Sequence, residues 1–298
     1  MLKSENHGNV KLKADALLLL AAAIWGFAFV AQRQSMAYVT PFFFNGSRFL
    51  LGALVVLPFS GWKFSKEELK AGLIMGFVLF LAASLQQVGI VHTTAGKAGF
   101  ITGLYMIFVP ILGSLSGESS GFRTWLGVVT AVTGLYLLSM TDGAVLAIGD
   151  MLILLCALVF AVHVRLIGHY SRLHSPFKLA FLQYLVVGVL SLPLWIFQEK
   201  AATSGWQQSL IPIIYGGVLS AGIAYTLQIF AQRKAPAADC AVILSLEGAF
   251  AGLGGYLILG EYFSLRMLFG CALMLCGAIL AGLPEKKKEF DNAPTQIT

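Results

Sequence analysis

Apolar stretches long enough to cross a membrane, roughly 20 residues each, follow one another along almost the whole chain. This pattern limits the possible folds more than any other feature of the sequence. There are ten such stretches, at approximately 15–34, 41–60, 69–91, 97–117, 122–140, 148–169, 177–197, 208–231, 238–259 and 264–283. Only 11% of the 298 residues are charged, against roughly 25% in soluble domains. The sequence therefore predicts an all-α integral membrane protein with about ten transmembrane helices.

The distribution of Lys and Arg residues predicts how these spans are oriented. If the N-terminus is cytoplasmic, most of them fall on the inner side, and the outer side receives only Arg33, Lys97, Lys200 and Arg266. Cytoplasmic loops carry an excess of Lys and Arg, and an even number of spans returns the chain to its starting side. Both termini, including a cytoplasmic tail at 285–298, are therefore expected inside the cell. By analogy, the expected location is a bacterial inner membrane.

The chain also contains an internal repeat. Matching residues recur in order at an offset of 135 and later of 143: Asp15 with Asp150, Pro41-Phe42 with Pro176-Phe177, Gly117-Glu118 with Gly260-Glu261, and Gly134 with Gly277. Each half holds five spans, and this odd number makes the second half enter the membrane from the opposite side. We therefore predict two inverted five-helix repeats, at 15–140 and 148–284. Inverted repeats are a recurring plan of secondary transporters.

Two segments carry a resemblance to a known family. Residues 99–110 (GFITGLYMIFVP) precede Gly117-Glu118, and their counterpart 243–251 (ILSLEGAFA) precedes Gly260-Glu261. From residue 15 to 284 the chain resembles the drug/metabolite transporter superfamily, in its ten-helix EamA-type branch. The resemblance implies two five-helix repeats around a central cavity, and export or import of small metabolites. Similar proteins often have proline after the glutamate of the ninth span; Gly248 stands there in this chain, so a proline-driven helix break is not expected.

Glu247 is the strongest candidate for a functional residue. It lies near the middle of the ninth span, deeper than any other acidic residue. A charge at that depth costs roughly 2.5–3.5 kcal/mol on insertion scales, so the carboxyl should face a cavity, form a pair or stay protonated. We predict a role in substrate binding or proton coupling. Packing through a hydrogen bond between helices is the alternative.

Arg48 and Trp25 are the next candidates. Arg48 lies within the second span and carries the same cost. It is expected to pair with Glu247, to bind an anionic group of a substrate, or to extend its long side chain to the outer interface. Trp25 lies mid-span, where its indole is placed to stack on a substrate ring, with Phe160 as its repeat mate. Plain helix packing is the alternative for the indole.

Several uncharged polar residues are further candidates. Gln86 and Gln87 in the third span and Gln228 in the eighth are expected to line a polar pathway or to bond between helices. Tyr105 in the fourth span is a weaker cavity candidate, as are Asn45, Gln183 and Tyr225.

Other conspicuous residues are predicted to be structural. We expect His163 and Arg165 at the membrane interface rather than in a proton relay. The Gly-Glu-x4-Arg elements that start at Gly117 and Gly260 are predicted to be turns that end helices. Pro110 is predicted to kink the fourth span, because proline lacks a backbone N–H.

No pattern in the sequence points to catalysis, a metal, a cofactor or nucleic acid. The four cysteines include no CxxC pair, the histidines have no zinc spacing, and no P-loop or contiguous basic stripe is present. We therefore predict that the chain is not an enzyme. It is expected to be a secondary transporter of small amino-acid-like or drug-like solutes that works by alternating access in membrane lipid, with a proton as the candidate coupling ion. A non-transporting membrane scaffold or a membrane-embedded enzyme is the alternative.

Overall fold

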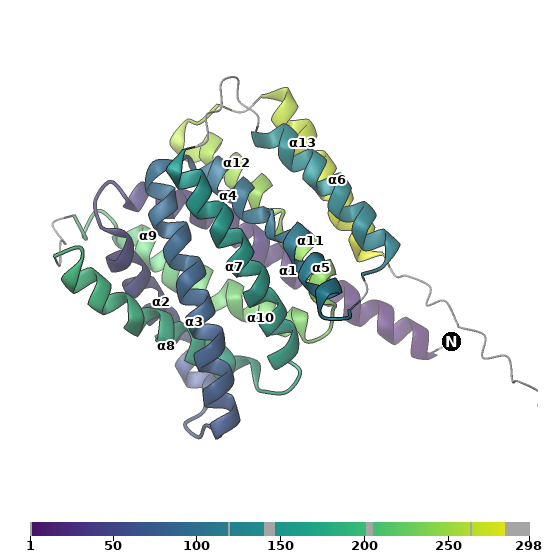
Figure 1. Cartoon of the computed structure of the whole chain (residues 1–298), viewed down its shortest axis with the longest axis horizontal. Helices are drawn as coiled ribbons and strands as arrows, with labels where there is room; N and C mark the ends of the chain where they lie inside the picture. The colour runs from purple at the N-terminus through teal and green to yellow at the C-terminus, as the bar shows by residue number, and fades with distance from the viewer. Residues whose placement is uncertain (1, 119, 140–146, 201–204, 263, 284–298) are drawn as a thin grey trace, which may run out of the picture.

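The structure, a computed structural model, describes residues 2–118, 120–139, 147–200, 205–262 and 264–283. These residues form helices joined by short loops (Figure 1). The helices are α1 (Leu2–Ser35), α2 (Pro41–Ser60), α3 (Lys66–Gly89), the 3₁₀ turn η1 (Ile90–His92), α4 (Ala95–Gly103), α5 (Tyr105–Leu115), α6 (Phe122–Ser139), α7 (Ile148–Tyr170), α8 (Pro176–Phe197), α9 (Leu210–Ile214), the π-helix η2 (Tyr215–Tyr225), α10 (Thr226–Gln232), α11 (Ala237–Leu244), α12 (Glu247–Leu259) and α13 (Leu265–Gly282). The predicted tail at 285–298 lies outside the described residues.

The helices group into rods that match the predicted spans. Three of the rods are composite: α4 with α5, α9 with η2 and α10, and α11 with α12. Within the described part of the chain, eight rods are long and apolar enough to cross a membrane, and Leu265–Ala281 is a shorter apolar helix beside α6. The prediction of an all-α membrane protein with about ten spans is therefore confirmed.

The ends of the helices follow from local sequence. Pro41 and Pro176, which are repeat mates, stand in the first turn of α2 and α8, where a missing N–H leaves no bond unmade. Ser65 and Glu68 form a capping box at the start of α3. Gly260 ends α12 in the left-handed conformation, with φ of 68°. These signals place the loops, and the loops set the lengths of the rods.

Contacts between the rods follow a twofold pattern that exchanges the two halves. Three rods pack against their own repeat mates: α2 against α8, α6 against α13, and the α4–α5 rod against the α11–α12 rod through α4 and α12. Two further contacts are exchanged by the repeat: α3 packs on α7 as α10 and η2 pack on α1, and α1 packs on α12 as α7 packs on α5. The second half is therefore folded like the first and packed against it around an approximate twofold axis.

The helix pair α6 and α13 lies side by side at one edge of the molecule (Figure 1). Glycines bring the two backbones close together. A methyl group at Gly127 would lie 2.7 Å from the carbonyl oxygen of Gly277, and one at Gly277 would lie 2.6 Å from that of Gly127. Small residues are the usual means of close packing between membrane helices. We refer to this contact as the α6–α13 seam.

Two rods are interrupted at corresponding places. In the first half α4 ends at Gly103 and α5 begins at Tyr105, and in the second half α11 ends at Leu244 and α12 begins at Glu247. The N–H of Gly248 donates to the carbonyl of Ser245 over 3.0 Å, a bond of the tighter 3₁₀ type. The ninth span is therefore interrupted although it lacks the proline, because a 3₁₀ turn makes the interruption.

Pro110 does not lie at the interruption of its own rod. It lies inside α5, after the break at Leu104. The break itself carries bonds of the 3₁₀ type, from Leu104 N–H to the Ile101 carbonyl over 3.2 Å and from Ile107 N–H to the Leu104 carbonyl over 2.9 Å. The two interruptions are thus built alike.

Candidate functional site

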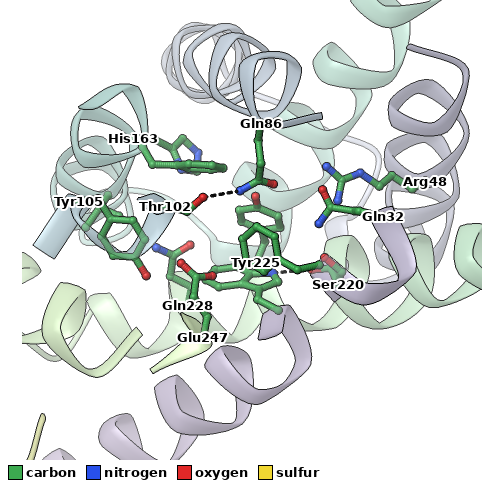
Figure 2. A pocket seen from close by; sticks show the side chains of 14 residues that line it. Gln32, Arg48, Gln86, Thr102, Tyr105, His163, Ser220, Tyr225, Gln228 and Glu247 are labelled. Atoms are coloured by element: carbon green, nitrogen blue, oxygen red, sulfur yellow. Dashed lines mark hydrogen bonds between the residues drawn. The ribbon is translucent and has the colours of Figure 1, made fainter. Parts of the chain in front are cut away.

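A cavity of about 430 Å³ lies between the two halves (Figure 2). Its walls come from α1, α2, α3, α4, α5, α7, η2, α10 and α12. The lining residues are Trp25, Phe29, Gln32, Arg48, Gln86, Thr102, Tyr105, Phe160, His163, Val164, Ser220, Tyr225, Gln228 and Glu247.

The irregular stretches of the rods lie at this cavity. Thr102 and Tyr105 flank the α4–α5 interruption, and Glu247 is the first residue of α12. Ser220 and Tyr225 belong to the π-helix η2. Non-helical backbone is tolerated at membrane depth only where it is buried in protein or lines a cavity, and π segments are frequent at functional sites. The backbone itself therefore marks this region as a site.

One end of the cavity carries the carboxyl group of Glu247. This side chain is 4% exposed, and the amide of Gln228 and the hydroxyl of Tyr105 lie beside it (Figure 2). Oε1 of Glu247, Oε1 of Gln228 and the Tyr105 hydroxyl have no hydrogen-bond partner among the described residues. Since buried polar atoms are nearly always bonded, three such atoms at one place suggest a ligand or water that completes them.

The other end carries Arg48, which is 2% exposed. Its Nε donates to Oδ1 of Asn45 over 3.0 Å, and Asn45 in turn donates to the Ala83 carbonyl. The guanidinium lies 4.8 Å from the ring centre of Phe49 and 5.4 Å from that of Phe44. No carboxylate within the described ranges forms an ion pair with it, and its Nη2 has no partner there.

Aromatic residues form the middle of the cavity. The rings of Trp25 and Tyr225 lie 4.6 Å apart at their centres, tilted by 58°. The indole N–H of Trp25 donates to the carbonyl of Ser220 over 3.3 Å. Phe49 lies 6.0 Å from Tyr225 and packs behind it. These contacts hold Trp25 and Tyr225 in place between the two polar ends.

His163 also faces the cavity. Its side chain has an exposed fraction of 0%, and its Nε2 lies 2.8 Å from Oε1 of Gln183. The predicted interfacial position of His163 is therefore wrong, because α7 is packed against α3, α4 and α5 and turns this side chain inward. Its neighbour Arg165 pairs with Glu118, 70% of whose side chain is exposed, over 3.1 Å.

With the geometry established, the comparisons identify the family. A model of the EamA-like transporter family matches residues 12–140 and again 147–283. The chain belongs to this family. It is accordingly a multi-pass membrane transporter built from two EamA domains, and the family is not a family of enzymes.

Relatives and solved structures agree with this assignment. An uncharacterized transporter of Archaeoglobus fulgidus is 36% identical over 279 residues, which cover 93% of this chain and 88% of that one. The threonine/homoserine exporter RhtA of Salmonella typhimurium is 25% identical over 248 residues, 76% of this chain and 77% of the exporter. A solved structure titled "Crystal structure of protein" has a TM-score of 0.74 at 18% identity and covers 90% of this chain and 96% of that chain. That last likeness shows the fold.

The EamA transporter structure brings six of the seven predicted site residues to one cavity: Trp25, Arg48, Gln86, Tyr105, Gln228 and Glu247. Gln86 lines it and donates to the Thr102 hydroxyl over 3.3 Å (Figure 2). Gln87 does not reach it. Its Nε2 lies 3.3 Å from the sulfur of Met36 instead, because neighbouring residues of a helix point about 100° apart. The roles of these residues remain predictions.

Two alternatives for Arg48 are wrong. It makes no ion pair with Glu247, and its side chain is too deeply buried to extend to the interface. The weaker candidates Asn45 and Gln183 lie behind the cavity wall, where each holds a lining residue, Arg48 and His163 respectively. Tyr225 is itself part of the lining.

Sequence reasoning missed part of the lining, and one signal was available for it. Phe29 and Gln32 follow Trp25 at helical spacings of four and seven residues, which places all three on one face of α1. Thr102 and Ser220 gave no comparable signal, because small polar residues are common between membrane helices for packing alone.

The two Gly-Glu turns have the predicted backbone and different partners. Gly117 and Gly260 both have positive φ, 80° and 68°. Glu118 pairs with Arg165 of α7, whereas Glu261 accepts from the backbone N–H groups of Ala95 and Gly96 at the start of α4. No group of three or more His, Cys, Asp or Glu residues suited to a metal occurs among the described residues.

Proposed function

We propose that this EamA transporter is a secondary transporter that moves a small amino-acid-like metabolite through the central cavity by alternating access, coupled to a proton at Glu247. The observation that carries the proposal is the set of buried polar atoms in the cavity that lack partners among the described residues: Gln32 Oε1, Arg48 Nη2, Tyr105 Oη, His163 Nδ1, Gln228 Oε1 and Glu247 Oε1. Leaving such atoms unpaired costs about 1–3 kcal/mol each. A bound solute that pairs with them offsets this cost.

Alternating access is supported by the way the two halves pack. Their contacts are exchanged by an approximate twofold axis, as α2 with α8 and α6 with α13 illustrate. If two similar halves exchange their conformations, a site between them opens first to one side and then to the other. We propose the repeats at 15–140 and 148–284, with both termini in the cytoplasm as the Lys and Arg distribution indicates.

The solute class rests on the charges and on a relative. Arg48 offers a cation and Glu247 a carboxylate in one cavity, which suits a solute with groups of both signs. A relative is named as an exporter of threonine and homoserine. Amino-acid-like solutes are therefore the first to test, and drug-like solutes the second.

The test is uptake into proteoliposomes under an imposed pH gradient, with pooled metabolites, the native chain and Glu247→Gln. Glu118→Gln is the matched control, because it makes the same change on an exposed side chain. We expect gradient-driven uptake with the native chain and the control, and none with Glu247→Gln. Unchanged uptake by Glu247→Gln would make Glu247 a packing residue. No flux with any pool would favour a non-transporting scaffold.

A further inference from the structure

The cavity holds one buried cation and one buried carboxylate that do not neutralise each other. Arg48 and Glu247 are 2% and 4% exposed, and no ion pair joins them. A buried charge without a countercharge is strongly unfavourable. A partner of opposite sign, or for Glu247 a proton, would remove this cost.

The two groups lie at opposite ends of the cavity, with Tyr225 between them. Figure 2 shows Arg48 and Gln32 on one side of Tyr225, and Glu247, Gln228 and Tyr105 on the other. Tyr225 is close enough to interact electrostatically with both Arg48 and Glu247. A ligand that neutralises both charges must therefore span the aromatic middle of the cavity.

The Arg48 end is prepared for an anion. Phe44 and Phe49 lie against the guanidinium and Asn45 accepts from its Nε, which leaves Nη2 without a partner among the described residues. A guanidinium presents its donors in a planar fork that matches a carboxylate. The free edge of Arg48 thus suits a carboxylate group.

The Glu247 end is prepared for a donor with several N–H groups. Oε1 of Glu247 and Oε1 of Gln228 are acceptors without partners in the described part of the chain, and the Tyr105 hydroxyl lies beside them. An ammonium group has three donors, so it can satisfy these oxygens together. Its positive charge also neutralises the carboxylate.

We propose that the substrate is an elongated zwitterion, with a carboxylate on Arg48, an ammonium group at Glu247, and an apolar chain lying along Trp25 and Tyr225. This inference rests on the proposed function, because it names the solute that the cavity carries. In an α-amino acid both charged groups are attached to one carbon atom, so we expect such a solute to occupy one end of the cavity rather than both, because Tyr225 lies between the ends. Such a solute would place its ammonium near Gln32 and leave Glu247 without a countercharge.

Binding to the purified full-length protein in detergent, followed by calorimetry, tests the proposal. The ligands are the unbranched ω-amino acids from glycine to aminooctanoic acid. Affinity should rise with chain length to a maximum and then fall, and the best ligand should exceed glycine by about tenfold or more. An affinity that is highest for glycine, or that does not depend on length, would overturn the inference.

Two variants test which end of the cavity binds each charged group of the ligand. With Arg48→Gln, the best ω-amino acid should bind no better than the n-alkylamine of the same length. With Glu247→Gln, it should bind no better than the corresponding fatty acid. Glu118→Gln, a change on an exposed side chain outside the cavity, should keep the native length optimum. If a variant fails to fold, the binding of the ω-amino acid series to the native chain still tests the proposal.

The outcomes separate this inference from the proposed function. Proton-driven uptake of α-amino acids, without binding of the longer series, would contradict the elongated substrate and leave the transporter assignment in place. Absence of both binding and flux across all solutes would contradict both. A length optimum with the expected Arg48 and Glu247 dependence supports both.

Discussion

The two halves of the chain meet at the α6–α13 seam and at the central cavity, and they meet differently at each. At the seam the contacts are matched. The offset of 143 that carries Gly134 onto Gly277 also carries Gly127 onto Gly270, so the contact of Gly127 with Gly277 and that of Gly134 with Gly270 are the same contact seen from either half.

In the cavity the two halves contribute different chemistry. The offset of 135 relates Arg48 to Gln183, a cation to an amide, and Trp25 to Phe160, an indole to a phenyl ring. Arg48 lines the cavity, whereas Gln183 lies behind it and holds His163. Repeat-related positions at the cavity therefore differ in side chain, and Arg48 and Gln183 differ also in whether they reach the lining.

The seam and the cavity therefore depend on different properties of their residues. Close backbone packing requires small residues on both helices, so the seam keeps the same residue in both halves. A site for an asymmetric solute requires different groups at its two ends, and repeat mates with different side chains provide them. Substitutions at matched positions should have equal effects, and those at unmatched positions unequal ones.

The largest expected effect is at the unmatched pair Arg48 and Gln183. Arg48→Gln, which installs the residue of its mate, should lower kcat/KM for transport by about thirtyfold or more, because losing one partner of a buried charge interaction costs roughly 2–5 kcal/mol. Gln183→Leu removes the hydrogen bond to His163 and should cost less than about tenfold. Initial rates in proteoliposomes measure both. Equal losses would mean that the halves contribute equally to the site.

The next effect is at the matched glycines. Gly134→Ala and Gly277→Ala each place a methyl group against backbone of the facing helix, and such overpacking costs typically about 1–3 kcal/mol. We expect the two losses of unfolding free energy to agree within about 0.5 kcal/mol. Fluorescence-monitored unfolding in detergent measures them.

Gly168→Ala is the control for the seam. Its added methyl would meet the Cβ of Ala237 at 3.4 Å and Nε2 of Gln232 at 3.8 Å, both ordinary contacts. Since alanine is a better helix former than glycine by about 1 kcal/mol, this variant should be neutral or slightly more stable. Losses that differ widely between Gly134→Ala and Gly277→Ala would show that the seam is not matched energetically.

Much of this fold was predictable from the sequence, because the signals that define it are local. A span is recognised from roughly 20 apolar residues, and the repeat from residues such as Asp15 and Asp150 that recur at a fixed offset. The cost of burying charge marked Arg48 and Glu247 without any knowledge of their neighbours. Those three kinds of evidence led to the membrane fold and to the two charged residues of the candidate cavity.

The rest of the fold and the candidate site depended on the directions of side chains and on local turns, which the sequence does not specify. Gln86 and Gln87 are adjacent and chemically identical, and only the rotation of α3 decides that Gln86 faces the cavity. Depth along a span suggested an interfacial His163, whereas the packing of α7 turns it inward. The interruption before Glu247 has no proline to announce it, since a 3₁₀ turn makes it.

A smaller effect is expected at the unmatched pair Trp25 and Phe160. Trp25→Phe removes the hydrogen bond to the Ser220 carbonyl, which is worth about 0.5–1.5 kcal/mol. Substrate affinity, measured by calorimetry, should therefore fall by roughly twofold to tenfold. Phe160→Tyr keeps an aromatic ring on the same wall and should change affinity less. A larger loss with Phe160→Tyr would reverse the assignment of the indole as the ring that organises the site.

The smallest expected effect is at Pro110, where the two interrupted rods differ in sequence and agree in structure. Because the α11–α12 interruption forms without proline, and the α4–α5 interruption lies at Leu104 rather than at Pro110, the proline is not needed to make the break. Pro110→Ala should leave the transport rate and substrate affinity within about twofold of the native values, a change below about 0.5 kcal/mol.

Amide hydrogen exchange tests the same point directly on the backbone. In Pro110→Ala the N–H groups of Leu104 and Ile107 should exchange as they do in the native chain, since their 3₁₀ bonds to Ile101 and Leu104 involve no atom of the proline. Slower exchange there, together with a large loss of transport, would show that α4 and α5 had joined into one continuous helix. The first half would then depend on proline for an interruption that the second half makes through its turn alone.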